Sequence, residues 1–175
     1  MEKNALKPFS VRWLTRTALL LAVTLVFQMF GFPQMVTGPA VNAMLMISGI
    51  YVGPLGGIII GLLTPWIAFM RGTLAPPLAP MIPFIMLGNA VIVILWVLFR
   101  VLIKNVYIGS IAGMVIGAVA KFLILSTAVR LIVSVPPPIA QAMQIPQLYT
   151  ALLGGVIALV VDRLISVAFR NYNED

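Results

Sequence analysis

The sequence predicts an all-α integral membrane protein with six transmembrane helices and both termini in the cytoplasm. Of the 175 residues, 62% are hydrophobic and only 9% are charged, whereas about one quarter of the residues of a soluble domain are charged. The apolar residues form continuous runs without the alternation of a membrane β-barrel. Because a spanning helix takes about 20 residues, we expect residues 1–175 to form a single domain of six transmembrane helices.

The six apolar segments follow one another with short interruptions. The first comes after a basic start with Lys3, Lys7, Arg12 and Arg16. A retained helix, with Trp13 at the membrane interface, is expected there because no signal-peptide cleavage pattern follows. The expected helices cover residues 18–30, 40–51, 55–70, 81–99, 107–131 and 148–169.

The basic residues predict the orientation. With six helices both ends lie on one side, together with most of the basic residues, namely Lys3, Lys7, Arg12, Arg16, Arg100, Lys104, Arg163 and Arg170. The opposite side has only Arg71 and Arg130, so the positive-inside rule places the termini in the cytoplasm. The net charge of +7 therefore indicates orientation and no nucleic-acid partner.

The three outer connections are then residues 31–39, 71–80 and 132–146. Ten of the 13 prolines lie in these connections or at their edges. Proline restricts φ and lowers the entropy lost on ordering, so the set predicts pre-shaped loops on one face. Each single proline can also be interpreted as a simple helix terminator.

The polar residues of the apolar segments lie in their outer halves. They include Gln28, Asn42, Trp66, Asn89 and Lys121, whereas the inner halves are nearly all aliphatic. This distribution predicts a pocket that is open to the outside and closed to the inside. Trp66 either stacks on a ligand ring or belongs to the aromatic belt of the membrane interface.

Lys121 is the strongest single indication of a site, because a lysine deep in a membrane costs several kcal/mol unless it faces a cavity or partner. Gly109, Gly113, Gly117 and Lys121 recur every four residues, so they share one helix face. Glycine ridges favour close helix contact, which predicts that Lys121 points into the bundle. The alternative is a lysine that snorkels to the outer headgroups.

No acidic residue is placed to neutralise Lys121 or Arg71. The four acids are Glu2, Asp162, Glu174 and Asp175, which lie at the termini or at the inner end of the last helix. Two unpaired cations near one pocket predict an anionic ligand with a carboxylate or a phosphate. The amides of the last outer loop, Gln141, Gln144 and Gln147, either close over the ligand or are solvated.

The composition gives little support to catalysis or metal binding. There is no histidine and no cysteine, and no pair of carboxylates, which removes most acid–base and metal-assisted schemes. A serine activated by Lys121, with Ser48 or Ser126 as the nucleophile, has no specific spacing in its favour. We expect a protein that is not an enzyme and has no metal site or cofactor of its own.

Three motifs resemble those of one transporter family. Ala18 and Ala22 form A-x-x-x-A in the first helix, residues 37–42 read TGPAVN, and residues 78–89 read LAPMIPFIMLGN. With six helices in under 200 residues, the chain resembles the substrate-binding S component of an energy-coupling factor (ECF) vitamin transporter.

The resemblance implies a binding protein in a prokaryotic plasma membrane. It would capture a vitamin or related micronutrient outside and dock on a transmembrane coupling subunit with two ATPases, which would supply ATP hydrolysis because this chain has no P-loop. Ala18 and Ala22 would contact the coupling subunit, and Asn42, Arg71, Asn89 and Lys121 would bind the ligand.

The departures from the family restrict the substrate. Metal-specific relatives depend on an N-terminal histidine that this chain lacks, and thiamine binding uses acidic residues. An anionic vitamin such as pantothenate, biotin or folate fits better. The alternatives are a self-sufficient facilitator or channel for a small anion, which needs polar positions through the inner half, and a structural assembly subunit.

Overall fold

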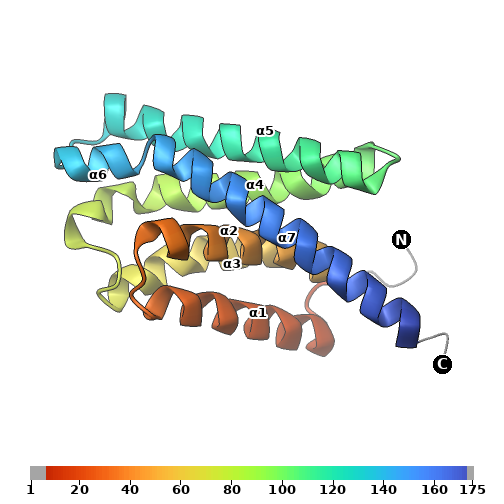
Figure 1. The fold of residues 1–175 in the computed structure, drawn as a ribbon. Helices are drawn as coiled ribbons and strands as arrows, with labels where there is room; N and C mark the ends of the chain where they lie inside the picture. Colours follow the sequence, from red (N-terminus) through yellow and green to blue (C-terminus); the bar gives the residue numbers. More distant parts are fainter. Residues whose placement is uncertain (1–6, 173–175) are drawn as a thin grey trace.

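The computed structural model describes residues 7–172, and all the regular structure in that range is helical (Figure 1). Three short elements join the helices at one end of the bundle: the 3-10 helix η1 (Pro76–Met81), the π-helical turn η2 (Ala128–Ile132) and α6 (Pro137–Ala142). The long helices are α1 (Val11–Met29), α2 (Gln34–Tyr51), α3 (Gly53–Met70), α4 (Ile82–Leu102), α5 (Val106–Thr127) and α7 (Ile145–Tyr172). The expectation of an all-α protein is confirmed.

Five helical stretches within the described residues are long and apolar enough to cross a membrane. They are α1, α3, η1 with α4, α5 with η2, and α6 with most of α7. The sixth long helix, α2, has 18 residues but is not among these five. The prediction of six spanning helices is therefore supported for five, and α2 is a central, largely buried helix that carries several polar residues.

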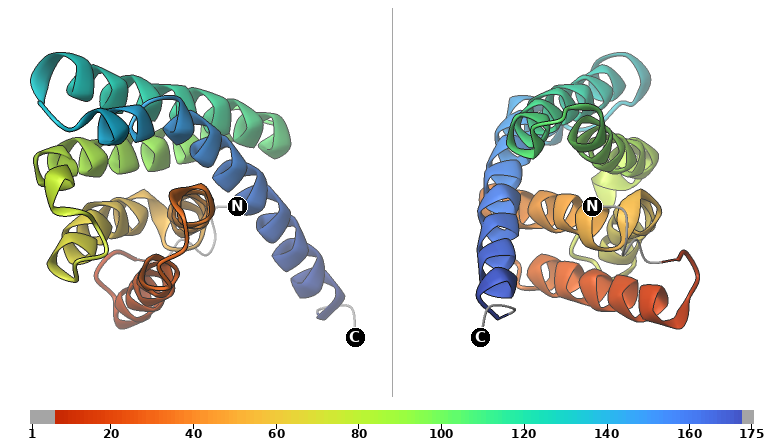
Figure 2. Two further views of the ribbon diagram at one scale, coloured as in Figure 1. Left: turned by 60° about the vertical axis from the view of Figure 1, so that its left-hand side comes forward. Right: turned by 90° about the vertical axis from the view of Figure 1, so that its right-hand side faces the viewer.

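The helices stack in layers. In Figures 1 and 2, α4 lies between α5 and the pair formed by α2 and α3, and α1 lies at the far edge beside this pair. The last helix, α7, crosses the bundle diagonally, packs on α2 and α5, and ends away from the other helices. Both ends of the described chain lie at the end of the bundle opposite η1 and α6 (Figure 1).

The helix bounds differ from the sequence-based expectation mainly at the N-terminal ends. The α1 helix begins seven residues early, at Val11, because the side chain of Ser10 accepts a hydrogen bond from the backbone N–H of Trp13. The α2 helix begins at Gln34 and includes Pro39. The outer loops contain two short helices, η1 and α6, and each has proline in its first turn, where the missing N–H needs no partner.

Trp13 is not an interface residue. Only 2% of its surface is exposed, and its indole Nε1–H donates to the carbonyl oxygen of Val52 at 2.7 Å. That carbonyl lies in the turn between α2 and α3, so Trp13 ties α1 to this turn. Trp13 can be buried because its indole N–H, which requires an acceptor inside a protein, finds one in the turn carbonyl.

The glycine ridge of α5 faces into the bundle, as predicted, and the structure shows that it lies against α4. Gly109, Gly113 and Gly117 are buried, and a Cβ atom at Gly113 would lie 2.9 Å from the Cα of Trp96 and 3.0 Å from the carbonyl oxygen of Leu95. Because these are backbone atoms, they cannot move aside without displacing the helix. The ridge therefore sets the distance between α4 and α5 and carries the Lys121 side chain toward α4.

The part of the bundle nearer the termini is closed by apolar packing. Buried side chains of α2, α3, α4, α5 and α7 form one cluster, and it includes Leu45, Ile60, Ile92 and Trp96. Beyond it, toward the end with the termini, Arg100 pairs with Asp162 at 3.0 Å. Arg100 also donates to Ser110, and the Tyr51 hydroxyl donates to Asp162. This ion pair joins α4 to α7 and completes the closure.

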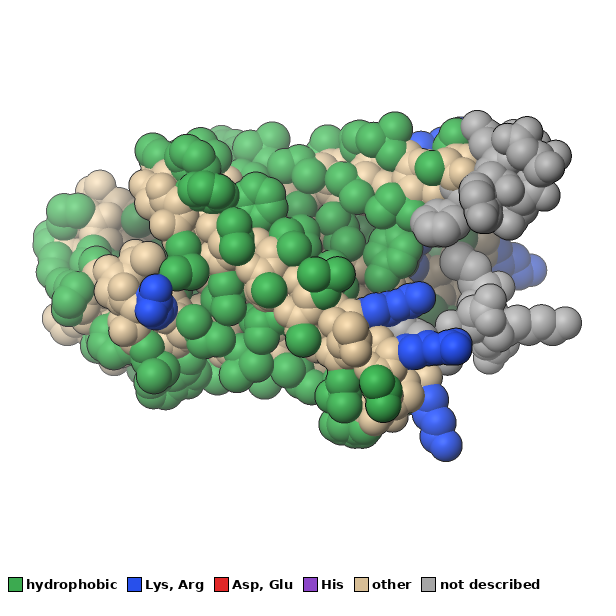
Figure 3. Space-filling model, turned by 90° about the horizontal axis from the view of Figure 1, so that it is seen from below, with side chains coloured by type: hydrophobic (Ala, Val, Ile, Leu, Met, Phe, Trp, Pro, Cys, Tyr) green, Lys and Arg blue, Asp and Glu red, His purple; other side chains and the backbone are tan. Residues whose placement is uncertain are grey.

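The surface matches a membrane location. Seen from below, the middle of the molecule is covered largely by hydrophobic side chains, and Lys and Arg side chains gather near the end with the termini (Figure 3). The described basic residues at that end are Lys7, Arg12, Arg16, Arg100, Lys104 and Arg163, whereas Arg71 and Arg130 lie at the other end. The cytoplasmic placement of the termini stays a prediction from this asymmetry.

The Gly113→Ala variant tests the ridge. In an open helix, alanine in place of glycine is favourable by about 1 kcal/mol. Here we expect the opposite, a loss of about 1–3 kcal/mol from overpacking against α4, visible as a lower thermal unfolding temperature in detergent. Val115→Ala on the exposed face of α5 is the control. A higher unfolding temperature for Gly113→Ala would contradict the proposed close contact.

Candidate functional site

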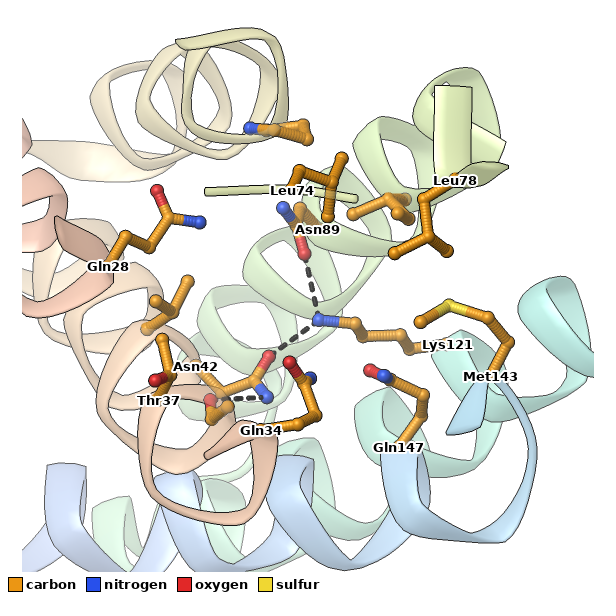
Figure 4. A pocket seen from close by; sticks show the side chains of 14 residues that line it. Gln28, Gln34, Thr37, Asn42, Leu74, Leu78, Asn89, Lys121, Met143 and Gln147 are labelled. Carbon is orange, nitrogen blue, oxygen red and sulfur yellow. Dashed lines mark hydrogen bonds between the residues drawn. The ribbon is translucent and has the colours of Figure 1, made fainter. Parts of the chain in front are cut away.

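Lys121 lies inside the bundle and does not snorkel. Only 4% of its surface is exposed, and its ammonium donates to Asn42 Oδ1 at 2.6 Å and to Asn89 Oδ1 at 2.8 Å. These three residues come from α5, α2 and α4, so they join three helices at one point (Figure 4). The predicted inward orientation of Lys121 is confirmed.

The two asparagines are held with their amide oxygens toward Lys121. The Nδ2 group of Asn42 donates to the carbonyl oxygen of Gly38, and that of Asn89 donates to the carbonyl oxygen of Gly61, both at 2.9 Å. Because each NH₂ group is bound to a backbone carbonyl, each side-chain oxygen faces the ammonium. Both asparagines are buried, so the packing holds this arrangement firmly.

Small residues make the room for this cluster. A Cβ atom at Gly88 would lie 3.0 Å from Cγ of Lys121, and one at Gly61 would lie 3.0 Å from Cβ of Asn89. At Gly154 of α7, a Cβ atom would lie 2.6 Å from Cβ of Asn42. Each of the three side chains of the cluster therefore packs against a glycine of a neighbouring helix, where no side chain takes up the space.

The ammonium group borders a pocket at the end of the bundle opposite the termini. The pocket has an enclosed volume of about 100 Å³, and about 610 Å³ when the open space at its mouth is included. Figure 4 shows its side chains. The lining consists of Gln28, Gln34, Thr37, Gly38, Val41, Asn42, Pro65, Leu74, Leu78, Ile85, Asn89, Lys121, Met143 and Gln147.

The pocket contains a positive charge without a carboxylate. None of its lining residues is acidic, and Asp162 is engaged with Arg100 at the other end of the bundle. Glu2, Glu174 and Asp175 lie outside the described residues. Within the described chain, Lys121 is therefore held by neutral amide oxygens, which leave its charge uncompensated.

Gln28 brings a second unsatisfied group to the pocket. Its side-chain oxygen Oε1 is buried and has no hydrogen-bond partner among the described residues. A buried acceptor without a donor costs about 1–3 kcal/mol, so a native structure tolerates it where a ligand or water completes it. Gln28 enters from α1, on the side of the pocket opposite Lys121 (Figure 4).

Two predicted binding residues do not reach the pocket. Trp66 is 49% exposed and points away from it, and Arg71 is an exposed residue at the C-terminal cap of α3. The helical phase explains Trp66, because its neighbour Pro65 faces inward and lines the pocket. Of the six predicted binding residues, the structure brings together Gln28, Asn42, Asn89 and Lys121.

The structure also adds pocket residues that the sequence did not indicate. Gln34 and Thr37 lie on the same face of α2 as Asn42, and this signal was missed because α2 was expected to begin at residue 40. The three glutamines that were expected in the last outer loop lie in different surroundings. Gln147 is 5% exposed and lines the pocket, Gln144 accepts from Arg130, and Gln141 is exposed.

The A-x-x-x-A residues lie far from the pocket lining. Ala18 and Ala22 are both exposed on α1, the least buried of the candidate spans. They are thus not used for packing inside the described chain. Small exposed residues on a membrane helix allow another helix to approach closely, but their predicted role in docking stays a prediction.

The fold and the site define a class of protein. A bundle of apolar helices that is closed at one end and holds a polar pocket at the other is a multi-pass membrane protein built to bind a small molecule. The comparisons agree with this. The profile of the family "ECF transporter, substrate-specific component" matches residues 12–166, so the chain belongs to that family.

No curated protein and no solved structure matches the chain significantly. The family is a transporter component and not a catalytic family.

The Asn89→Ala variant tests the amide clamp on Lys121. Removing one of its two acceptors should lower the stability of the ligand-free protein by about 1–3 kcal/mol, because the ammonium loses a partner in an apolar surrounding. Thermal unfolding in detergent measures this. Gln141→Ala, an exposed amide in α6, is the matched control. Equal unfolding temperatures for both variants would show that the clamp contributes nothing to stability.

Proposed function

We propose that this chain captures a small anionic micronutrient, such as a water-soluble vitamin, at the outer face of a prokaryotic cell membrane. As the substrate-binding domain of an ECF importer it would deliver this cargo together with a transmembrane coupling subunit and two ATPase subunits. The proposal gives the chain no ATP site and no other cofactor. Family membership supports the transport role, and the pocket supports the anion.

The observation that carries the proposal is the buried Lys121 ammonium. An uncompensated charge in an apolar surrounding is costly, so a cation held only by two amide oxygens is best explained by an anion that joins it. An ammonium has three donors, and the two asparagines use two of them. The third is available for an oxygen of the ligand.

The basic residues support an outer position for the pocket, because most of them lie at the opposite end with the termini. Capture at one face also agrees with the closed inner half. A self-sufficient facilitator would need a polar path past Leu45, Ile60 and Ile92, which are fully buried apolar residues, and past the Arg100–Asp162 pair. We therefore favour a binding subunit that needs partners for delivery.

Binding by the purified chain tests the proposal. A calorimetric and thermal-shift screen against water-soluble vitamins, without ATP or partner subunits, should identify a tight ligand. A compound present at 100 times its dissociation constant stabilises the folded state by about 2.7 kcal/mol. We expect Lys121→Met to weaken this binding by about 10-fold or more, because a hydrogen bond to a charged group is lost.

Lys104→Met, which removes an exposed lysine at the other end of the bundle, is the control and should bind normally. Unchanged affinity in a folded Lys121→Met variant would refute the role of Lys121. Failure of every vitamin to bind would refute capture by this chain alone.

Docking is tested by Ala18→Leu and Ala22→Leu. The larger side chains should block close approach of a partner helix, so uptake by the assembled transporter should be lost while ligand binding by the isolated chain stays normal. Val115→Leu, on the exposed face of α5, is the control for added bulk at the membrane surface. Normal uptake in both alanine variants would remove the docking role.

A further inference from the structure

The single positive charge of the pocket lining can balance one negative charge on a ligand. Lys121 is the one charged residue in the lining. The other two basic residues at this end do not contribute, because Arg71 is exposed outside the pocket and Arg130 binds the side-chain oxygen of Gln144 at 2.6 and 3.0 Å. A dianion would bring a second charge that no described residue of the lining compensates, and its desolvation would oppose binding.

The amide oxygens around the ammonium also disfavour a ligand group that carries more than one negative charge. Asn42 and Asn89 each use one of the two N–H donors of the side-chain amide on a backbone carbonyl, which leaves one N–H on each. Their oxygens lie within 2.8 Å of Nζ and would repel further negative charge. A phosphate, with three charged oxygens, needs several donors, whereas a carboxylate can bind through one oxygen to the free N–H of Lys121.

The other side of the pocket is bordered by Gln28. Its Oε1 atom is buried without a partner among the described residues, and a ligand hydroxyl or amide N–H would complete it. Since Gln28 and Lys121 enter from opposite sides (Figure 4), the donor belongs to a part of the ligand remote from the carboxylate. The walls between them are largely apolar, with Val41, Pro65, Leu78, Ile85 and Met143.

We propose that the substrate is a monocarboxylate with an apolar middle and a remote hydroxyl or amide donor, bound with its carboxylate at Lys121 and its donor at Gln28. This inference rests on the proposed function and makes it more specific. It excludes dicarboxylates and phosphate esters as the preferred cargo.

A panel of compounds grouped by charge tests the substrate class. The monocarboxylates with a remote donor are pantothenate and biotin, the dianions are folate and pyridoxal phosphate, the neutral compounds are riboflavin and pyridoxine, and the cation is thiamine. Calorimetry with the purified full chain in detergent should give the tightest binding for a monocarboxylate. Its neutral counterpart, pantothenol or biotin amide, should bind roughly 10- to 100-fold more weakly, because it loses the charged hydrogen bond.

Two variants assign the ends of the ligand. Lys121→Gln keeps an N–H donor but removes the charge, so it should abolish the preference for the acid over its neutral counterpart. Gln28→Met should lower the affinity for the acid and for its neutral counterpart equally, by about 5- to 10-fold. The ratio of the two affinities should therefore stay unchanged. Gln141→Met, in an exposed position of α6, is the matched control and should change neither affinity.

The outcomes separate this inference from the proposed function. Tightest binding of folate, pyridoxal phosphate, a neutral compound or thiamine would overturn the monocarboxylate inference but leave substrate capture standing. Equal affinity of the natural chain for the acid and its neutral counterpart would also overturn it, as would a normal acid preference in folded Lys121→Gln. Unchanged affinities in Gln28→Met would overturn the role of Gln28. Binding of no compound would overturn both proposals.

Discussion

The structure depends on one constraint, a buried ammonium group that has no carboxylate beside it among residues 7–172. Lys121 is held by Asn42 and Asn89, and these amides are themselves held by backbone carbonyls of their own or a neighbouring helix. Neutral acceptors make a buried cation tolerable without cancelling its charge. The positive charge that we propose attracts an anion is therefore kept, and an Asp or Glu at either position would cancel it.

The helix packing serves this constraint. Lys121 reaches the centre of the bundle because the glycine ridge brings α5 against α4, and because Gly88 leaves its side chain a path. The same ridge sits deeper in the bundle beside Ile92 and Trp96, where the apolar cluster closes the inner half. Close packing on one side of the Lys121 cluster and the pocket on the other give a site accessible from one end. This arrangement suits a member of the family of ECF transporter substrate-specific components.

Much of this organisation could be predicted from the sequence. The apolar runs followed from hydropathy and the inward face of Lys121 from the four-residue spacing of the glycines. The outer positions of Gln28, Asn42, Asn89 and Lys121 indicated that they line one pocket. Other positions could not be predicted. Trp66 and Pro65 are neighbours, yet one faces outward and the other lines the pocket. Trp13 was predicted at the membrane interface, but the turn at Val52 provides an acceptor for its indole and allows its burial.

The sequence by itself determined the class of this protein, because hydropathy, charge asymmetry and an intramembrane lysine act locally and can be counted along the chain. Only the tertiary structure decided which polar groups meet. It paired Lys121 with two asparagines 79 and 32 residues away and turned Ala18 and Ala22 outward. It also left Oε1 of Gln28 without a partner in the described part of the chain. These outcomes depend on the angles and rotations at which helices pack, and a one-dimensional pattern does not specify them.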